Sequence, residues 1–172
     1  MNRRELETLL LTLESTPVLV ARAAAKISPE QAREGPAVGG FSLIEHVWHL
    51  ADLEREGYGT RIRRILSEDE PILSDFEGAR VASERVYRRR DLAEGLAAFA
   101  AARACNINKL RSVSGSDWKR KAVQESAGLV TLEDIPRMMS EHDQSHTREI
   151  AELLAHVRFG MPVSEHQSSA VA

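Results

Sequence analysis

The sequence of 172 residues is poor in cysteine and in aromatic residues. Its single cysteine, Cys105, cannot form an intrachain disulfide, which excludes a small scaffold held together by disulfides. We find no signal-peptide pattern and no apolar run of about 18 residues, the length that a membrane helix needs. These absences predict a cytoplasmic protein without a membrane span.

Charge of one sign is also lacking. The formal net charge is -3, and basic residues gather only in short runs such as YRRR at 87–90. We therefore expect neither a nucleic acid nor a membrane surface as partner. The length, with 42% hydrophobic and 28% charged residues, fits one globular domain. We place this domain at residues 1–160 and expect the small, polar and unpatterned tail 161–172 to be disordered.

Four long stretches have the apolar periodicity of a helix, and clusters of glycine, proline and polar residues separate them. They span about 2–26, 42–66, 91–111 and 131–158. No stretch alternates apolar and polar residues with β-branched ones, so we expect an all-α fold without strands. The long connection at 67–90 then predicts a four-helix bundle with a crossover between the second and third helices.

Local signals mark where these helices begin or bend. Ser42 with Glu45 forms a capping box before the second helix, and Thr131 with Asp134 does the same before the fourth. Pro17 predicts a kink or a break inside the first helix.

Two histidines stand four positions apart in the fourth helix. His142 and His146 fall at the centre of its apolar stripe, between Met139 and Ile150. Burial lowers the pKa of an imidazole, so both rings should be neutral and need hydrogen-bond partners or a metal. Residues at i and i+4 can aim their ring nitrogens at one point, as in zinc sites. A pair of core histidines bonded to hydroxyls or carbonyls is the alternative.

A third ligand would come from HVWH in the second helix. The helical wheel puts His46 inside the apolar arc and His49 at its edge, a slight preference for His46. We interpret His156 and His166 as surface and tail residues.

Two charges also fall on apolar faces. Glu54 lies near the centre of the stripe of the second helix, and Arg103 lies among the apolar residues of the third. Because an unpaired interior charge costs several kcal/mol, we predict that Glu54 and Arg103 pair across the core. Arg61 is the competing partner. The pair either fixes the packing register or lines a pocket beside the metal.

Several stretches together resemble the DinB-like family, which includes the YfiT-type metal hydrolases. They are GGFSLIEHVWHLADLE, RIRRIL, FAAARACNINKL and AGLVTLEDIPRMMSEHDQSHTREIAELL, within a similarity from about Leu6 to Leu154. The resemblance implies an up-down-down-up four-helix bundle whose metal is held by a His-Leu histidine and a His-x-x-x-His pair. These are His49, His142 and His146, so the resemblance overrides the preference for His46. It also implies a homodimer.

Three neutral imidazoles leave a coordination position open, as in catalytic sites, and zinc or nickel suits them. The resemblance implies a metal-dependent enzyme acting on a small molecule, either a hydrolase or a transferase with a low-molecular-weight thiol as cosubstrate. The alternative is a non-enzymatic module that binds a metal or a ligand or serves in a stress response. A fourth protein ligand from His46 would favour that alternative.

Carboxylates near the ligands suggest supporting roles. Glu45 and Asp52, close to His49 along the helix, are expected to orient its ring. Asp143 follows the first histidine of the pair, where zinc proteases of the H-E-x-x-H type have a glutamate base. We treat Asp143 as a candidate base, but the role that we expect for it is that of a solvated acid on the helix surface.

Overall fold

A computed structural model describes residues 2–36 and 39–160, so the predicted tail 161–172 lies outside the described residues. The long helices are α1 (Arg3–Ala24), α2 (Leu43–Asp52), α3 (Gly59–Ser67), α5 (Leu92–Arg111) and α6 (Ile135–Phe159). A π-helical turn, Leu53–Tyr58, joins α2 to α3 into one continuous helical segment. Among the residues described, no helix combines the length and the apolarity that a membrane span needs.

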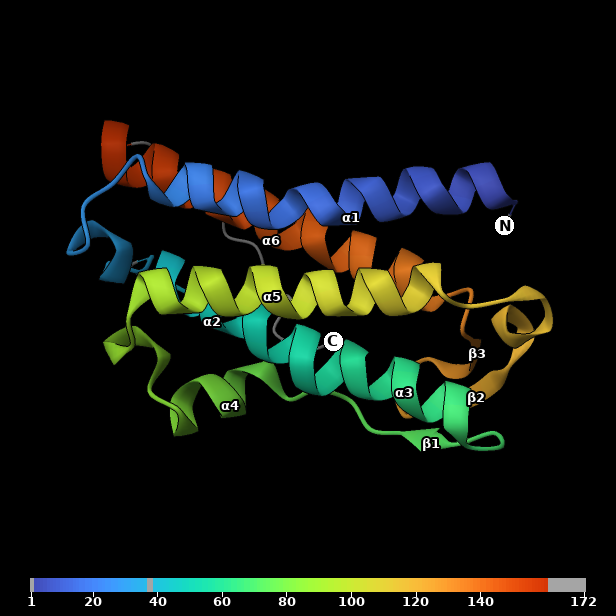
Figure 1. Cartoon of the computed structure of the whole chain (residues 1–172). Coiled ribbons are helices and arrows are strands. Elements are labelled where there is room, and N and C mark those ends of the chain that lie inside the picture. Colours follow the sequence, from blue (N-terminus) through green and yellow to red (C-terminus); the bar gives the residue numbers. More distant parts are fainter. Residues whose placement is uncertain (1, 37–38, 161–172) are drawn as a thin grey trace.

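The helical segments form an elongated bundle (Figure 1). α1 and α6 run in one direction, whereas the α2–α3 segment and α5 run in the other. The order along the chain is therefore up-down-down-up, and the connection from α3 to α5 travels the length of the bundle. The predicted four-helix bundle with a long crossover is confirmed.

Shorter elements fill the connections. The crossover carries β1 (Ile72–Leu73), α4 (Gly78–Glu84) and a 3-10 turn at Tyr87–Arg89. Between α5 and α6 lie a 3-10 turn at Gly115–Lys119 and two strands, β2 (Lys121–Gln124) and β3 (Gly128–Thr131). A further 3-10 turn, Gln31–Arg33, lies between α1 and α2.

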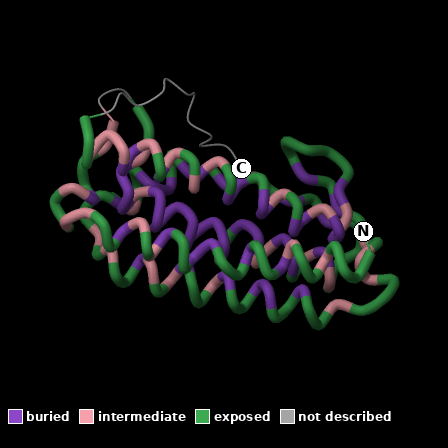
Figure 2. The backbone as a smooth tube through the Cα atoms, turned by 90° about the horizontal axis from the view of Figure 1, so that it is seen from above, coloured by how far each residue is buried: buried purple, intermediate pink, exposed green. Residues whose placement is uncertain are grey.

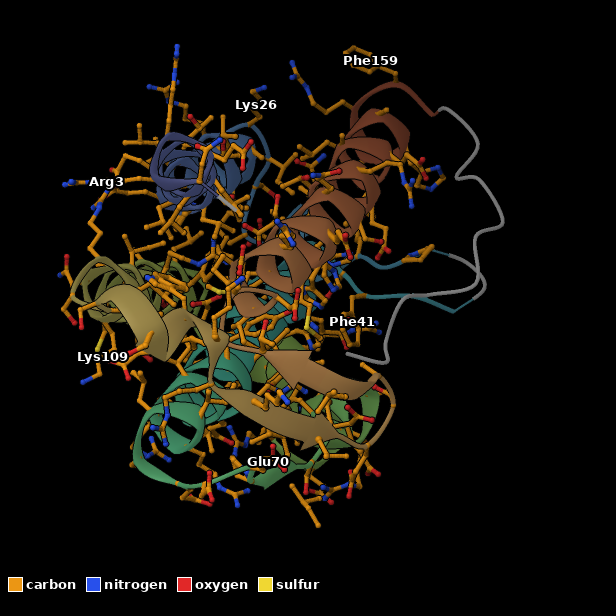
Figure 3. The ribbon with its side chains drawn as sticks, turned by 90° about the vertical axis from the view of Figure 1, so that its right-hand side faces the viewer. Arg3, Lys26, Phe41, Glu70, Lys109 and Phe159 are labelled. Carbon is orange, nitrogen blue, oxygen red and sulfur yellow. The ribbon has the colours of Figure 1, made fainter. Side chains whose placement is uncertain are left out.

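The strands form a three-stranded sheet in the order β1-β2-β3, so our expectation of no strands is wrong. β1 pairs parallel to β2, with Ile72 opposite Val123, and β2 pairs antiparallel to β3, with Ala122 opposite Val130. Strands of two to four residues are too short to show an alternating pattern in the sequence. The sheet lies at the end of the bundle where α3 ends and α6 begins (Figure 3).

Helix boundaries agree with the capping signals only in part. The capping box of Ser42 and Glu45 is confirmed, since α2 begins at Leu43. Thr131 donates its backbone N–H and its hydroxyl to Asp134 at 2.8 and 2.7 Å, but α6 begins only at Ile135. This second pair therefore closes a turn ahead of the helix rather than capping it.

The first helix is not interrupted by its proline. α1 is continuous through Pro17, so of the kink or break that we expected, the break is wrong. Pro17 itself is buried on the inner side of the helix.

The π-helical turn has a local cause. Asn106 of α5 donates its amide N–H to the carbonyl oxygen of Glu54 at 2.8 Å, and the N–H of Gly59 reaches the same oxygen. A Cβ atom on Gly59 would lie 3.0 Å from that oxygen and 3.1 Å from Asn106 Oδ1, so glycine permits this close approach of α5. π-Helical turns are frequent at functional sites, and this one lies one turn after His49.

Buried residues follow the inner faces of all four helical segments (Figure 2). Charged residues such as Arg3, Glu70 and Lys109 point away from the bundle (Figure 3). The apolar core is drawn mainly from Leu10, Leu13, Val20, Ile44, Val47, Leu50, Phe99, Ile107, Leu110, Ile135, Met139, Ile150 and Leu153. Within this core lie two polar clusters, one of histidines and one of ionised side chains.

Candidate metal centre

Four histidines from two helices meet in the core. α2 carries His46 and His49, and α6 carries His142 and His146. Their exposed fractions are 2%, 0%, 9% and 1%, so all four rings are withdrawn from water. The spacings of three and four residues place each pair on one helix face. His49 is therefore fully buried, which corrects the position at the edge of the apolar face that the wheel predicted.

The Nε2 atoms of three of these rings converge. His49 Nε2 lies 3.2 Å from His142 Nε2, which lies 3.0 Å from His146 Nε2. A neutral ring nitrogen carries either one proton or one lone pair, so His142 Nε2 can satisfy only one of its two neighbours. The three nitrogens lie within 4.8 Å of one another and form a donor set suited to a divalent cation.

The opposite ring nitrogens strengthen this interpretation. The Nδ1 atoms of His49 and His142 are buried and have no hydrogen-bond partner among the described residues. Buried polar atoms normally have partners, because leaving one unpaired costs about 1–3 kcal/mol. Hydrogen bonds among the described residues therefore do not account for these rings, whereas a cation at the Nε2 atoms would give each ring a ligand role.

Burial keeps the rings in the form that binds metals. It lowers the pKa of His46 to about 4 and that of His142 to about 3, and neighbouring rings add to the shift of His142. The pKa values of His49 and His146 are also well below their usual range, for the same reason. All four rings are therefore neutral near pH 7, as metal ligation requires.

His49, His142 and His146 form a triad, and His46 lies beside this triad rather than within it. Its Nδ1 is 2.9 Å from Nδ1 of His146, on the ring edge away from the Nε2 cluster. Glu149 Oε2 lies 3.7 Å from His146 Nδ1 and 3.8 Å from His46 Nε2. Sequence reasoning missed Glu149, although its position three residues after His146 on the same helix could have indicated it.

The carboxylates expected to orient His49 are engaged elsewhere. Glu45 accepts hydrogen bonds from Ser42 and from Arg88. Asp52 accepts from Tyr87 at 2.6 Å and from two arginines. Since Nδ1 of His49 has no partner in the described chain, neither carboxylate holds that ring, and the expectation is wrong.

The second cluster contains the predicted contact between Glu54 and Arg103. Arg103 Nη2 lies 2.8 Å from Glu54 Oε1, and the guanidinium also donates to both oxygens of Asp143, at 2.7 and 2.8 Å. Its Nη1 reaches the carbonyl oxygen of Leu13 in α1 at 2.8 Å. The cluster thus ties together all four helical segments. Burial raises the pKa of Glu54 and Arg103 opposes that shift.

Asp143 and Arg61 differ from what the sequence led us to expect. Asp143 is buried, so the role of a solvated surface acid is wrong, and Arg103 occupies the carboxylate that a general base would use. Arg61 faces Asp75, at 3.7 Å, and lies 5.4 Å from the centre of the Tyr58 ring, instead of competing for Glu54.

Aromatic rings enclose the histidines. The Phe41 ring centre lies 5.6 Å from that of His46 and 5.4 Å from that of His49. Phe76 from the crossover lies 5.9 Å from His49, and Tyr58 lies 6.3 Å from His142. Such apolar surroundings strengthen electrostatic interactions inside the site.

The fold and this cluster define an up-down-down-up helical bundle with three converging imidazoles in its core. The sequence model of the DinB superfamily matches residues 12–150, and the chain belongs to that superfamily. Its structure is similar to that of YfiT from Bacillus subtilis, described as a probable metal-dependent hydrolase with an unusual four-helix bundle topology. The TM-score is 0.82 at 22% identity, over 93% of this chain and 90% of that one, and it shows a shared fold.

A curated relative from Bacillus licheniformis carries the name "Putative metal-dependent hydrolase". It is 34% identical over 76 residues, which are 44% of this chain. The match spans 43% of the relative, less than half of its length.

Proposed function

We propose that this protein is a metal-dependent enzyme acting on a small molecule, with His49, His142 and His146 as ligands of a divalent cation. The convergence of three buried Nε2 atoms at contacts of 3.0 and 3.2 Å carries the proposal. The names given to YfiT and to the Bacillus licheniformis relative support it. Zinc and nickel both accept three imidazoles, so either ion can fill the site.

The donor set favours catalysis over a structural role. Three protein ligands leave a position for a fourth, and an ion held by neutral rings supplies Lewis acidity that favours the anionic form of water or of a thiol. The reaction is therefore hydrolysis or transfer of a low-molecular-weight thiol to an electrophile. The protein contributes neutral ligands and an aromatic wall of Phe41, Phe76 and Tyr58 that limits water around them.

The homodimer and the cytoplasmic location are further parts of the proposal. On α1, Leu11, Val18 and Leu19 are each more than half exposed, and their spacing of seven and eight residues places them on one face. This apolar face supports contact with a second copy. Leu19→Glu should convert a dimer into a monomer, as measured by light scattering; a wild-type monomer would contradict this part.

Metal content tests the ligand assignment. We would incubate wild type and the alanine variants of His49, His142, His146 and His46 with zinc or with nickel, then measure bound metal by mass spectrometry. Wild type should bind near one equivalent, and the three ligand variants should lose it. His46→Ala should retain metal with a lower affinity. His156→Ala, on α6 outside both clusters, is the matched control.

A wild type that stays metal-free after both incubations contradicts the proposal. Where metal is bound, the cobalt-substituted protein separates the two reactions. A sulfur-to-cobalt charge-transfer band on adding 2-mercaptoethanol favours the thiol transferase. Hydrolysis of simple ester or amide probes without such a band favours the hydrolase.

A further inference from the structure

The three imidazoles of the triad differ in the partners of their outer ring nitrogen, Nδ1. The Nδ1 atoms of His49 and His142 have no hydrogen-bond partner in the described chain. His146 Nδ1, by contrast, lies 2.9 Å from His46 Nδ1, with Glu149 Oε2 3.7 Å away. His146 is therefore the one ring of the triad whose outer nitrogen is bonded, and its partner is a second buried histidine.

Proton placement follows from the ligand role. A neutral histidine that binds a cation through Nε2 carries its proton on Nδ1. The Nδ1–H of His146 then donates to Nδ1 of His46, which must be unprotonated to accept it. The proton of His46 consequently resides on its Nε2, and that atom faces Glu149 Oε2 at 3.8 Å.

We propose that His46 is a positioning residue for His146 rather than a fourth ligand, and that the nearby carboxylate of Glu149, which is beyond hydrogen-bond distance, favours the proton on Nε2 of His46. The inference rests on the proposed metal site. Hydrogen bonds to the outer nitrogen of a metal-bound histidine fix the orientation and the tautomer of the ring, and they raise its basicity. His46 does this from α2, so it couples the two helices that supply the ligands.

The surroundings allow little other motion of the two rings. Both are buried, and their centres lie 5.0 Å apart at an interplanar angle of 73°. Phe41 packs edge-on against His46, with an interplanar angle of 83°. Glu149 also accepts a hydrogen bond from Ser145 at 3.2 Å, which anchors its carboxylate on α6.

A second cation between His46, His146 and Glu149 is the competing use of the same atoms, because these three residues also have metal-ligand spacing. Such an ion would take the place of the proton on Nδ1 of His146. That ring would then have to bridge two ions as an imidazolate. Retention of the proton makes one ion per chain the expected state.

Zinc affinity tests the assignment through two substitutions of His46. His46→Asn keeps an acceptor oxygen near the position of Nδ1, whereas His46→Leu removes the acceptor and keeps the side chain apolar. Ile65→Val, which alters packing in the apolar core at the far end of α3 without removing a hydrogen bond, is the matched control. Competition with a chelator should show a loss of about 10–100-fold for His46→Leu, and Asn should restore most of it.

Nitrogen NMR of the zinc-loaded protein gives a readout that a packing defect would not change. In wild type, His146 should show a zinc-bound Nε2 and a protonated, slowly exchanging Nδ1. In His46→Leu, the same Nδ1 proton should exchange faster. The pattern in Ile65→Val should match wild type.

Three results would overturn the inference: equal zinc affinity of wild type and His46→Leu, a second zinc equivalent that disappears with His46→Leu, or complete loss of zinc as in His146→Ala. The first leaves the proposed function intact, since the triad still binds its ion. Conversely, a correct NMR pattern without turnover of any probe contradicts the enzyme and leaves the positioning role in place. Failure of wild type to bind zinc removes both.

Discussion

The histidine cluster and the cluster around Arg103 lie in the same core, but they are compensated in different ways. Arg103 faces two carboxylates, Glu54 and Asp143, at 2.7–2.8 Å, so its charge is neutralised within the fold. The four histidines face mainly one another. Two of their nitrogens, Nδ1 of His49 and of His142, have no hydrogen-bond partner in the described residues.

This difference separates what the fold needs from what the proposed chemistry needs. A charge in the core must be neutralised by neighbours, because its desolvation costs several kcal/mol. A neutral imidazole costs less when it is incompletely bonded, so the protein can keep several of them together for an ion. The Arg103 cluster should therefore stabilise the bundle, while the histidine cluster should stabilise it only when a metal is bound.

Removal of Arg103 should have the largest effect. Arg103→Met leaves Glu54 and Asp143 buried without their counter-ion, and we expect the free energy of unfolding to fall by about 3–5 kcal/mol. Arg111→Met is the control, because Arg111 pairs with Glu7 and Glu14 at the surface, where solvent screens the ion pairs, and its loss should cost much less. Urea denaturation measures both. Equal losses would mean that the buried cluster around Arg103 stabilises the bundle no more than an ion pair at the surface does.

Bound zinc should turn the histidine cluster into a part of the core that stabilises the fold. At about 100 times its dissociation constant, an ion that binds only the folded state raises the free energy of unfolding by about 2.7 kcal/mol. Denaturation of wild type with zinc or with a chelator measures the gain, which His142→Leu should abolish. A gain that survives in His142→Leu would place the ion elsewhere.

Acid should destabilise the metal-free protein through its histidines. The pKa of His46 is about 4 in the fold, against an ordinary value of 6.5, because burial disfavours the charged ring. Below 6.5 the unfolded chain binds protons that the folded chain does not, so stability falls as the pH drops toward 4 and is constant above 6.5. The slope is about 1.4 kcal/mol per pH unit for each such histidine.

The His46→Asn variant shows how much of this pH dependence of stability comes from His46. Urea denaturation of chelator-treated protein at about pH 6.5 and about pH 5.5 should show a loss smaller by about 1 kcal/mol in the variant than in wild type. Identical losses would mean that His46 takes up a proton in the folded state.

Helical periodicity was sufficient for the four-helix bundle and for the burial of some of its polar residues, but not for that of Asp143. It predicted that His142 and His146 lie in the core and that Glu54 contacts Arg103, as the structure has them. The sheet could not be predicted, because its strands of two to four residues pair through backbone groups from distant parts of the chain.

The side-chain partners inside the core were harder to predict than burial. Asp143 was expected at the helix surface, and a single helical wheel could not show the guanidinium from α5 that binds its carboxylate in the core. A helical wheel also gives no ring orientation, and only the structure shows that Nδ1 of His46 meets Nδ1 of His146. Contacts between helices depend on register and rotamers, which one helix alone does not determine.

The smallest expected effect is that of His142→Leu on the metal-free protein. The substitution removes a ring whose Nδ1 lacks a partner in the described chain, but it also removes the Nε2 that pairs with His49 or His146, so the two effects oppose each other and the free energy of unfolding should change by less than about 1 kcal/mol. Urea denaturation in the presence of a chelator measures this difference. A loss above about 2 kcal/mol would show that the ring is held by interactions of its own, and the histidine cluster would then be a structural element like the one around Arg103.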